Sequence, residues 1–146
     1  MSQILDLLEK VLSDDGYKLE RHPATDETPD YLEARLDDDY ELQAVVLPGL
    51  ESELPDVRLL QLYIPLPFEV SPQNQEAVRS ALTKVNFDVP LMGFNLHEEM
   101  GFLYFRTVQV VPAAPDVGTG ATLLDMVSIA HYLVTRYAGP LAEMAR

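Results

Sequence analysis

The side chains in this sequence that best suit metal binding or proton transfer are its three histidines. His97 is followed by Glu98 and Glu99. Adjacent residues do not all point at one ion, so a polar turn is a better interpretation of this run than a metal site. His22 falls in an expected loop and His131 in an expected helix, where a packed histidine is more common than a ligand. We therefore expect no metal site and no catalytic histidine.

Two further motifs lack residues that their chemistry needs. Asp37-Asp38-Asp39 has neither the alternate spacing nor the glycine and later glutamate of a calcium loop, so a solvated turn is expected. Gly118-Thr119-Gly120 lacks the further glycine of a dinucleotide-binding loop and the lysine of a P-loop. It precedes an expected helix whose N-terminus suits an anion, so a small-ligand or anion sensor stays an alternative. The sequence otherwise predicts a protein that is not an enzyme, with no catalytic residue and no cofactor.

Large aromatic residues gather on or next to the two most apolar of the expected strands. They are Tyr63, Phe68, Phe102, Tyr104 and Phe105. If helices cover only one face of the sheet, the other face must place its apolar surface against something else, such as a second copy of the chain or a client segment. We therefore predict a partner-binding surface formed by Tyr63, Phe68, Phe102 and Tyr104. The alternative is that both faces are buried within the monomer.

The first half of the chain is predicted to form one helix and four strands. Apolar residues recur at helical spacing over 4–12, with Ser2 as a possible N-cap and Gly16 just past the end. Alternating segments then predict strands at 17–21, 31–36, 40–47 and 57–66. The last of these is apolar on nearly both sides, which is typical of a central strand covered on two faces.

The second half contains two helices and a hairpin. Ser71-Pro72 is a helix start, and this helix is expected to end near Asn86. Strands are expected at 91–96 and 102–111. The last helix is expected to begin near Thr119 or Thr122, with Asp125 as a capping-box acid, and to be interrupted at Gly139-Pro140.

The resulting order is one helix, four strands, a helix, two strands and a helix. Grouped strands with helices between and outside the groups indicate an α+β fold rather than an alternating α/β fold. The short connections favour antiparallel pairing. We expect a single domain over residues 1–146, with one antiparallel sheet and helices on one face.

The chain is strongly acidic. Its formal net charge is −14, and the stretch 26–56 alone holds eleven acids and one base, Arg35. Such a surface repels nucleic acid and anionic membranes; it either attracts a basic partner or only keeps the protein soluble. The sequence has no cysteine, no long apolar run and no basic leader. We expect a cytoplasmic protein that binds neither nucleic acid nor membrane.

Several short motifs, mostly from Val78 to Val111, resemble those of the YbjN family, small bacterial proteins with a fold like that of type III secretion chaperones. The motifs are Val85-Asn86, Pro90-Leu91, Gly93-Phe94, Gly101 and Tyr104-Phe105-Arg106. The sequence departs from the family where His97-Glu98-Glu99 replaces an Asp-Gly-like turn, and its first half matches only in layout.

The resemblance implies an α-β-β-β-α-β-β-α type of fold that is often dimeric and has no known catalytic residues. Chaperones of this shape are small acidic homodimers that hold an extended client segment against apolar patches. It also implies structural roles for Gly93, Phe94, Gly101 and Arg106. We therefore expect a homodimeric protein-binding module with a chaperone-like or regulatory role; a dedicated type III secretion chaperone is an alternative.

Overall fold

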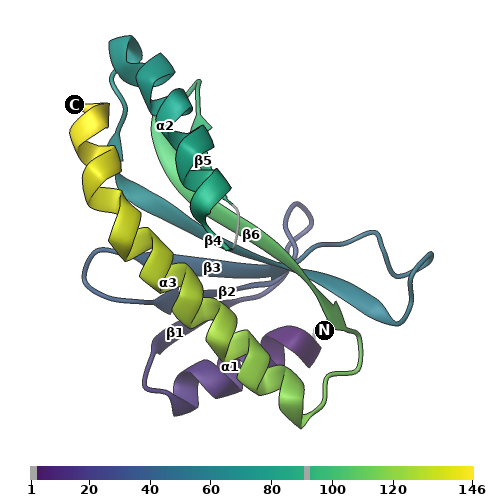
Figure 1. Cartoon of the computed structure of the whole chain (residues 1–146). Coiled ribbons are helices and arrows are strands. Elements are labelled where there is room, and N and C mark those ends of the chain that lie inside the picture. Colours follow the sequence, from purple (N-terminus) through teal and green to yellow (C-terminus); the bar gives the residue numbers. More distant parts are fainter. Residues whose placement is uncertain (1–2, 91–92) are drawn as a thin grey trace.

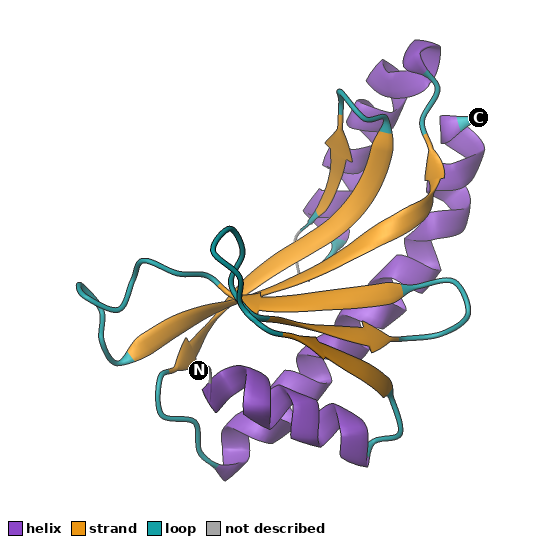
Figure 2. Ribbon diagram, turned by 180° about the vertical axis from the view of Figure 1, so that it is seen from behind, coloured by secondary structure: helices purple, strands orange, loops and turns teal. Residues whose placement is uncertain are grey.

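The computed structural model describes residues 3–90 and 93–146, which form one antiparallel sheet with the α-helices packed on one of its faces (Figures 1 and 2). The described elements are, in order, α1 (Gln3–Asp14), β1 (Lys18–His22), β2 (Tyr31–Arg35), β3 (Glu41–Val46), β4 (Val57–Glu69), the short 3-10 helix η1 (Pro72–Asn74), α2 (Gln75–Asp88), β5 (Phe94–His97), β6 (Phe102–Pro112) and α3 (Val117–Ala145). The predicted α+β class and the predicted element order are confirmed.

The described sheet has six strands in the order β1-β2-β3-β4-β6-β5, so the long strand β4 lies near its centre. Every neighbouring pair is antiparallel. α1 packs on β1 to β3, α2 lies beside β5, and α3 crosses β4 and β6 between them (Figure 1). Figure 2 shows the sheet from the opposite side, where the strands lie in front of α2 and α3 and α1 lies below them. We call this side the open face.

The core lies between the sheet and the helices. Alternate residues of β4, among them Leu60, Leu62 and Ile64, are fully buried against it. The residues between them on β4 are only half-buried. β4 is therefore central, as predicted, but within the described chain it is covered on one face and not on both.

The last helix begins earlier and runs further than the sequence predicts. Asp116 is its N-cap, and the side chains of Asp116 and Thr119 form a reciprocal capping box. The predicted capping pair Thr122 and Asp125 is therefore wrong. Pro140 does not interrupt α3, because Leu141 and Ala145 beyond it are buried and tie the last turn to the core.

Smaller differences affect the strands. His22 belongs to β1 rather than to the following loop, and the strand expected at 91–96 is described from Phe94 onward. Residues 91–92 and the expected N-cap Ser2 lie outside the described residues. Gly16 follows α1 with φ +91°, the left-handed conformation expected of a residue just past a helix end.

One helix in the described part of the chain, α3, is long and apolar enough to cross a membrane. Of its most apolar window, 44% is buried inside the fold. The inner side of α3 contacts the core through residues that include Leu123, Val127, Ala130 and Val134. Packing in the core thus accounts for much of its apolar composition.

Candidate functional site

A row of aromatic side chains crosses the open face at the β4–β6–β5 end of the sheet. The ring centroids of Tyr63 and Tyr104 are 5.3 Å apart, and those of Tyr104 and Phe102 are 5.9 Å apart. Phe102 in turn stacks on His97 of β5 at 5.0 Å. All four side chains are half-buried, so they pack against one another while one side of the row faces solvent.

The local sequence explains why these residues share one face. In a strand, alternate side chains point to opposite sides, so Phe102 and Tyr104 point away from the helices while Leu103 and Phe105 are fully buried. Tyr63 follows the same rule on β4. Burial raises the pKa of the Tyr63 hydroxyl, and the neighbouring Tyr104 adds to this effect.

Three of the four predicted partner-binding residues are brought together by the structure, and the fourth is not. Tyr63, Phe102 and Tyr104 form the aromatic row. Phe68 packs against the core cluster instead. The register of β4 against β6 shifts between Pro65 and Glu69, and such an irregularity changes which side chains point to which face.

Next to the aromatic row, the open face has a hollow of about 470 Å³. Its lining residues are all uncharged and come from β2, β3, β4 and the loop before β2. They are Thr28, Pro29, Tyr31, Gln43, Val45, Gln61 and Tyr63. The hollow is therefore a depression without charged side chains, and Tyr63 of the aromatic row forms part of its wall.

Polar groups at this centre bond to each other. Arg106 lies directly opposite Tyr63 in the β4–β6 register, and its Nε donates a 2.6 Å hydrogen bond to Gln61 Oε1. Arg106 is one of the residues to which the resemblance gives a structural role, and its side-chain partner here is a neutral amide. The positive charge stays exposed at the edge of the aromatic row.

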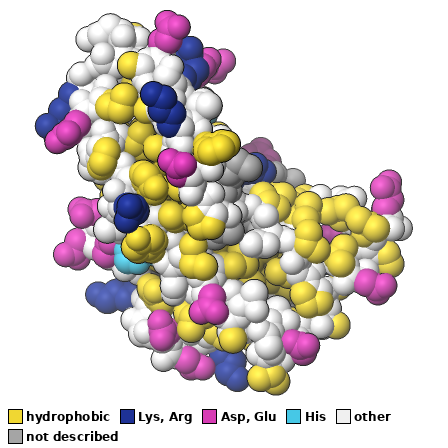
Figure 3. Space-filling model, in the orientation of Figure 1, with side chains coloured by type: hydrophobic (Ala, Val, Ile, Leu, Met, Phe, Trp, Pro, Cys, Tyr) yellow, Lys and Arg dark blue, Asp and Glu magenta, His cyan; other side chains and the backbone are white. Residues whose placement is uncertain are grey.

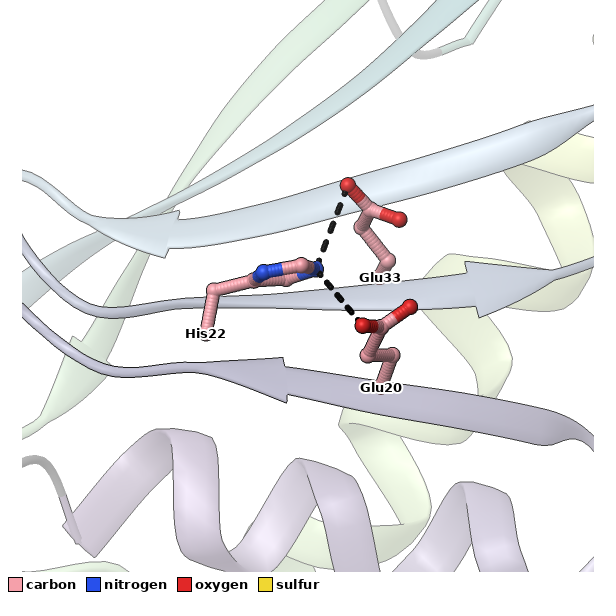
Figure 4. Close-up of side chains that lie close together, drawn as sticks. All are labelled: Glu20, His22 and Glu33. Atoms are coloured by element: carbon pink, nitrogen blue, oxygen red, sulfur yellow. Dashed lines mark ion pairs between the residues drawn. The ribbon is translucent and has the colours of Figure 1, made fainter.

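At the other end of the open face, the structure assembles a cluster that sequence reasoning missed. Glu20 and His22 of β1 and Glu33 of β2 place their ligand atoms within 4.8 Å of one another (Figure 4). Glu20 and His22 are two residues apart in a strand, so they share a face, and Glu33 is the register partner of Glu20. The Glu-x-His spacing was the available signal, but assigning His22 to a loop concealed it.

The other residues considered for chemistry have structural partners. His97 Nδ1 accepts a hydrogen bond from the Met100 backbone N–H, as expected of a turn. Asp37 accepts backbone N–H bonds from Asp39 and Tyr40, which makes the expected turn. His131 is a packed histidine, with Nε2 2.6 Å from Asp37 Oδ2.

The segment Gly118-Thr119-Gly120 lies inside the first turn of α3 rather than before it. The Asp116 carboxylate already accepts the Thr119 backbone N–H at the start of this helix. A Cβ atom at Gly120 would lie 3.1 Å from Val11 Cγ1, so this glycine permits close packing of α3 on α1. The arrangement favours a packing role over an anion site.

β6 is longer than its outer neighbour β5. The β5 register covers Phe102 to Phe105, and Gly93 exchanges two backbone hydrogen bonds with Arg106. Among the described strands, residues 107–112 are paired with β4 alone. Among the described residues this half of β6 therefore has no outer strand partner, and its Val110 side chain is 65% exposed.

The helix face of the molecule also exposes apolar side chains, including Val117, Ile129, Tyr132 and Met144 of α3. Figure 3 shows hydrophobic side chains on this face interspersed with charged ones, and a further group over the ends of β4 and β6. Single exposed apolar residues are normal on protein surfaces. The aromatic row differs because its rings contact one another.

Comparison with known proteins shows the fold. No family model matches the chain, and no curated protein matches it in sequence. The crystal structure of an uncharacterized protein from Methanothermobacter thermautotrophicus is similar, with a TM-score of 0.58 over 98% of this chain and 99% of that one, at 12% sequence identity. The whole arrangement of sheet and helices is therefore shared with a solved structure, and the resemblance to the YbjN family stays a prediction.

Proposed function

We propose that this chain is a non-enzymatic protein-binding module that associates with a second copy of itself through the open face of its sheet. The observation that carries the proposal is the row of Tyr63, Tyr104 and Phe102, whose rings contact one another on a face that no described helix covers. Tyrosine and phenylalanine in such a position are typical of interface anchors.

Charge favours this face as the place where two copies meet. A chain of net charge −14 repels its own copy. The hollow and the aromatic row contain no acid, and the nearby Arg106 is basic. Contact here therefore brings together a part of the surface that contains no acid. Around a two-fold axis the same patch serves both copies.

The test is the molar mass of the purified chain by size-exclusion chromatography with light scattering, over a range of protein concentrations. We expect a dimer mass for the native chain and a monomer mass for the double variant Tyr63→Ala/Tyr104→Ala. Tyr132→Ala, on the helix face, is the matched control and should keep the dimer mass. A monomeric native chain, or a double variant that keeps the dimer mass, contradicts the proposal.

A second candidate function, capture of an extended client segment, is favoured by the outer edge of β6 at 107–112, which pairs with no outer strand among the described residues. Arg106 directs its backbone N–H and C=O toward Gly93, so in an antiparallel strand Val108 and Val110 direct theirs to the same outer side. Such an edge accepts an added strand.

Val110→Pro tests this function, because proline removes the outward N–H and is tolerated at a sheet edge. If the chain captures segments there, peptides selected by the native chain from an array will not bind this variant. Val117→Pro serves as a control in a first helical turn, where proline is also tolerated. Equal peptide binding by Val110→Pro and the native chain would exclude edge capture.

A further inference from the structure

We propose that Glu20, His22 and Glu33 form a binding site for a divalent transition-metal ion, best suited to zinc. The proposal goes beyond the function proposed above and does not depend on it. Within the described residues this is the one group of three histidine or acidic side chains whose ligand atoms all lie within 4.8 Å of one another.

The distances suit a single ion. His22 Nε2 lies 3.4 Å from Glu33 Oε1 and 3.9 Å from Glu20 Oε1 (Figure 4). Two donors that each lie about 2.0–2.1 Å from a tetrahedral zinc ion are separated by about 3.3–3.4 Å. The His22–Glu33 pair already has this separation. All three donor atoms lie within 4.8 Å of one another, and a rotation of the Glu20 side chain, which is 72% exposed, brings its carboxylate closer to the other two.

The imidazole is held in the orientation that a ligand needs. The rings of His22 and Tyr31 are stacked, with centroids 4.5 Å apart and planes 10° from parallel. In this orientation Nε2 points toward the two carboxylates (Figure 4). His22 Nε2 is buried and has no hydrogen-bond partner among the described residues, which is uncommon for a buried polar atom. A metal ion would satisfy it.

The two carboxylates supply the charge that a cation balances. Glu20 and Glu33 are direct cross-strand partners on one face of β1 and β2. Like charges in this position destabilise a sheet. A divalent cation bound between them removes the repulsion and joins the edge strand β1 to β2.

The donor set selects the class of ion. Magnesium and calcium take oxygen ligands, and an imidazole nitrogen is a poor substitute. One histidine with two carboxylates suits zinc and similar first-row ions, and three protein ligands leave an open fourth position on zinc. Because the cluster lies on the open face, that position points toward solvent or toward whatever binds this face.

The test is calorimetric titration of the full chain with zinc chloride in excess magnesium, which suppresses weak binding to scattered carboxylates. We expect one saturable zinc site per chain. Glu20→Gln, His22→Gln and Glu33→Gln should each weaken zinc binding by about 100-fold or more, since loss of a group that only supports a ligand already costs up to about that factor. Circular dichroism checks that each variant is folded.

His97→Gln is the matched control, because His97 also lies on a strand end beside two acids; it should keep the native zinc affinity. Cobalt gives a second readout that a purely structural change would not remove. The visible absorption of bound cobalt should be intense with the native chain and with His97→Gln. It should be weak with His22→Gln. Absence of saturable zinc binding in magnesium, or cluster variants that bind zinc as tightly as the native chain, would overturn the proposal.

Discussion

Tyr63 of β4 and Tyr104 of β6 contact each other diagonally across two neighbouring strands, with ring centroids 5.3 Å apart. The residue directly opposite Tyr63 is Arg106, and the residue directly opposite Tyr104 is Pro65. Diagonal neighbours in an antiparallel pair are within reach of aromatic side chains. Tyr104 in turn contacts Phe102. The aromatic row therefore results from the register in which β4 and β6 pair.

Adjacent residues of β6 should differ sharply in their effect on stability. Phe105 is fully buried and packs edge-to-face on Phe94, so Phe105→Ala should lower the free energy of unfolding by about 3–5 kcal/mol. Tyr104→Ala removes only an aromatic contact on the open face and should cost roughly 0.5–1.5 kcal/mol. Urea unfolding, at a protein concentration where the chain is monomeric, measures both. Equal losses would show that the open face is part of the core.

The sequence predicted this difference only in part. The predicted partner-binding surface included Tyr104 and left out Phe105, and the structure places these two residues on opposite faces of β6. β4 was harder, because its outward positions include Leu59 and Tyr63 and so hide the alternation. Phe68 could not be placed from the sequence, since the register shift before Glu69 depends on the pairing with β6 and not on the residues of β4 alone.

The contact between Asp37 and His131 should make stability depend on pH. Burial raises the pKa of Asp37, but hydrogen bonds from His131 and from the backbone N–H groups of Asp39 and Tyr40 outweigh it and lower that pKa below its ordinary value. A carboxyl group with a lowered pKa in the folded state stabilises the fold above its unfolded pKa of about 3.9, and this contribution is lost as the pH falls through the folded pKa.

Asp37→Asn should therefore lower the free energy of unfolding at neutral pH by no more than about 1 kcal/mol, because the pair is partly exposed and screened by solvent. The difference between native chain and variant should shrink as the pH falls below about 4. Urea unfolding at several pH values measures it, with Asp38→Asn as the control in the same turn. A difference that stays constant down to strongly acidic pH would contradict the assignment.

The Asn86 side chain joins the end of α2 to the start of β5. Its amide donates to the Phe94 carbonyl at 2.8 Å, and its oxygen accepts the Phe94 N–H at 2.7 Å. Asn86→Ala leaves both backbone groups of a buried residue without partners, so it should cost about 1–3 kcal/mol. Lys84→Ala, exposed on the same helix, should have almost no effect in the same urea measurement. A small loss for Asn86→Ala would mean that solvent replaces both bonds.

This bond pair also explains the spacing of the motifs Val85-Asn86 and Gly93-Phe94. A Cβ atom at Gly93 would lie 3.1 Å from Asn86 Oδ1, so a glycine at this position lets the amide reach the strand. The sequence could indicate the motif but not its reason.

The sequence also predicted the wrong course for α3. A proline within a helix usually breaks it, but Leu141 and Ala145 are buried against the fold. This burial outweighs the effect of Pro140, and it cannot be seen from the local sequence.

The Glu20–His22–Glu33 cluster shows what sequence reasoning needs before it can locate such a site. The spacing of Glu20 and His22 is visible along the chain, but their relation to Glu33 depends on the register of β1 and β2 across a loop of eight residues, 23–30. Several registers suit a loop of that length, and a shift by one residue would place Glu33 on the helix face.

The central claim, that the open face is the contact surface between two copies, is tested most directly by hydroxyl-radical footprinting of the native chain across a dilution series. Tyr63, Phe102 and Tyr104 should be protected from oxidation in the associated state and become reactive on dilution, together with the loss of dimer mass. Tyr132, 59% exposed on the helix face, should react equally at every concentration. Unchanged oxidation of the three open-face aromatics while the mass falls, or protection of Tyr132 in their place, would contradict the account.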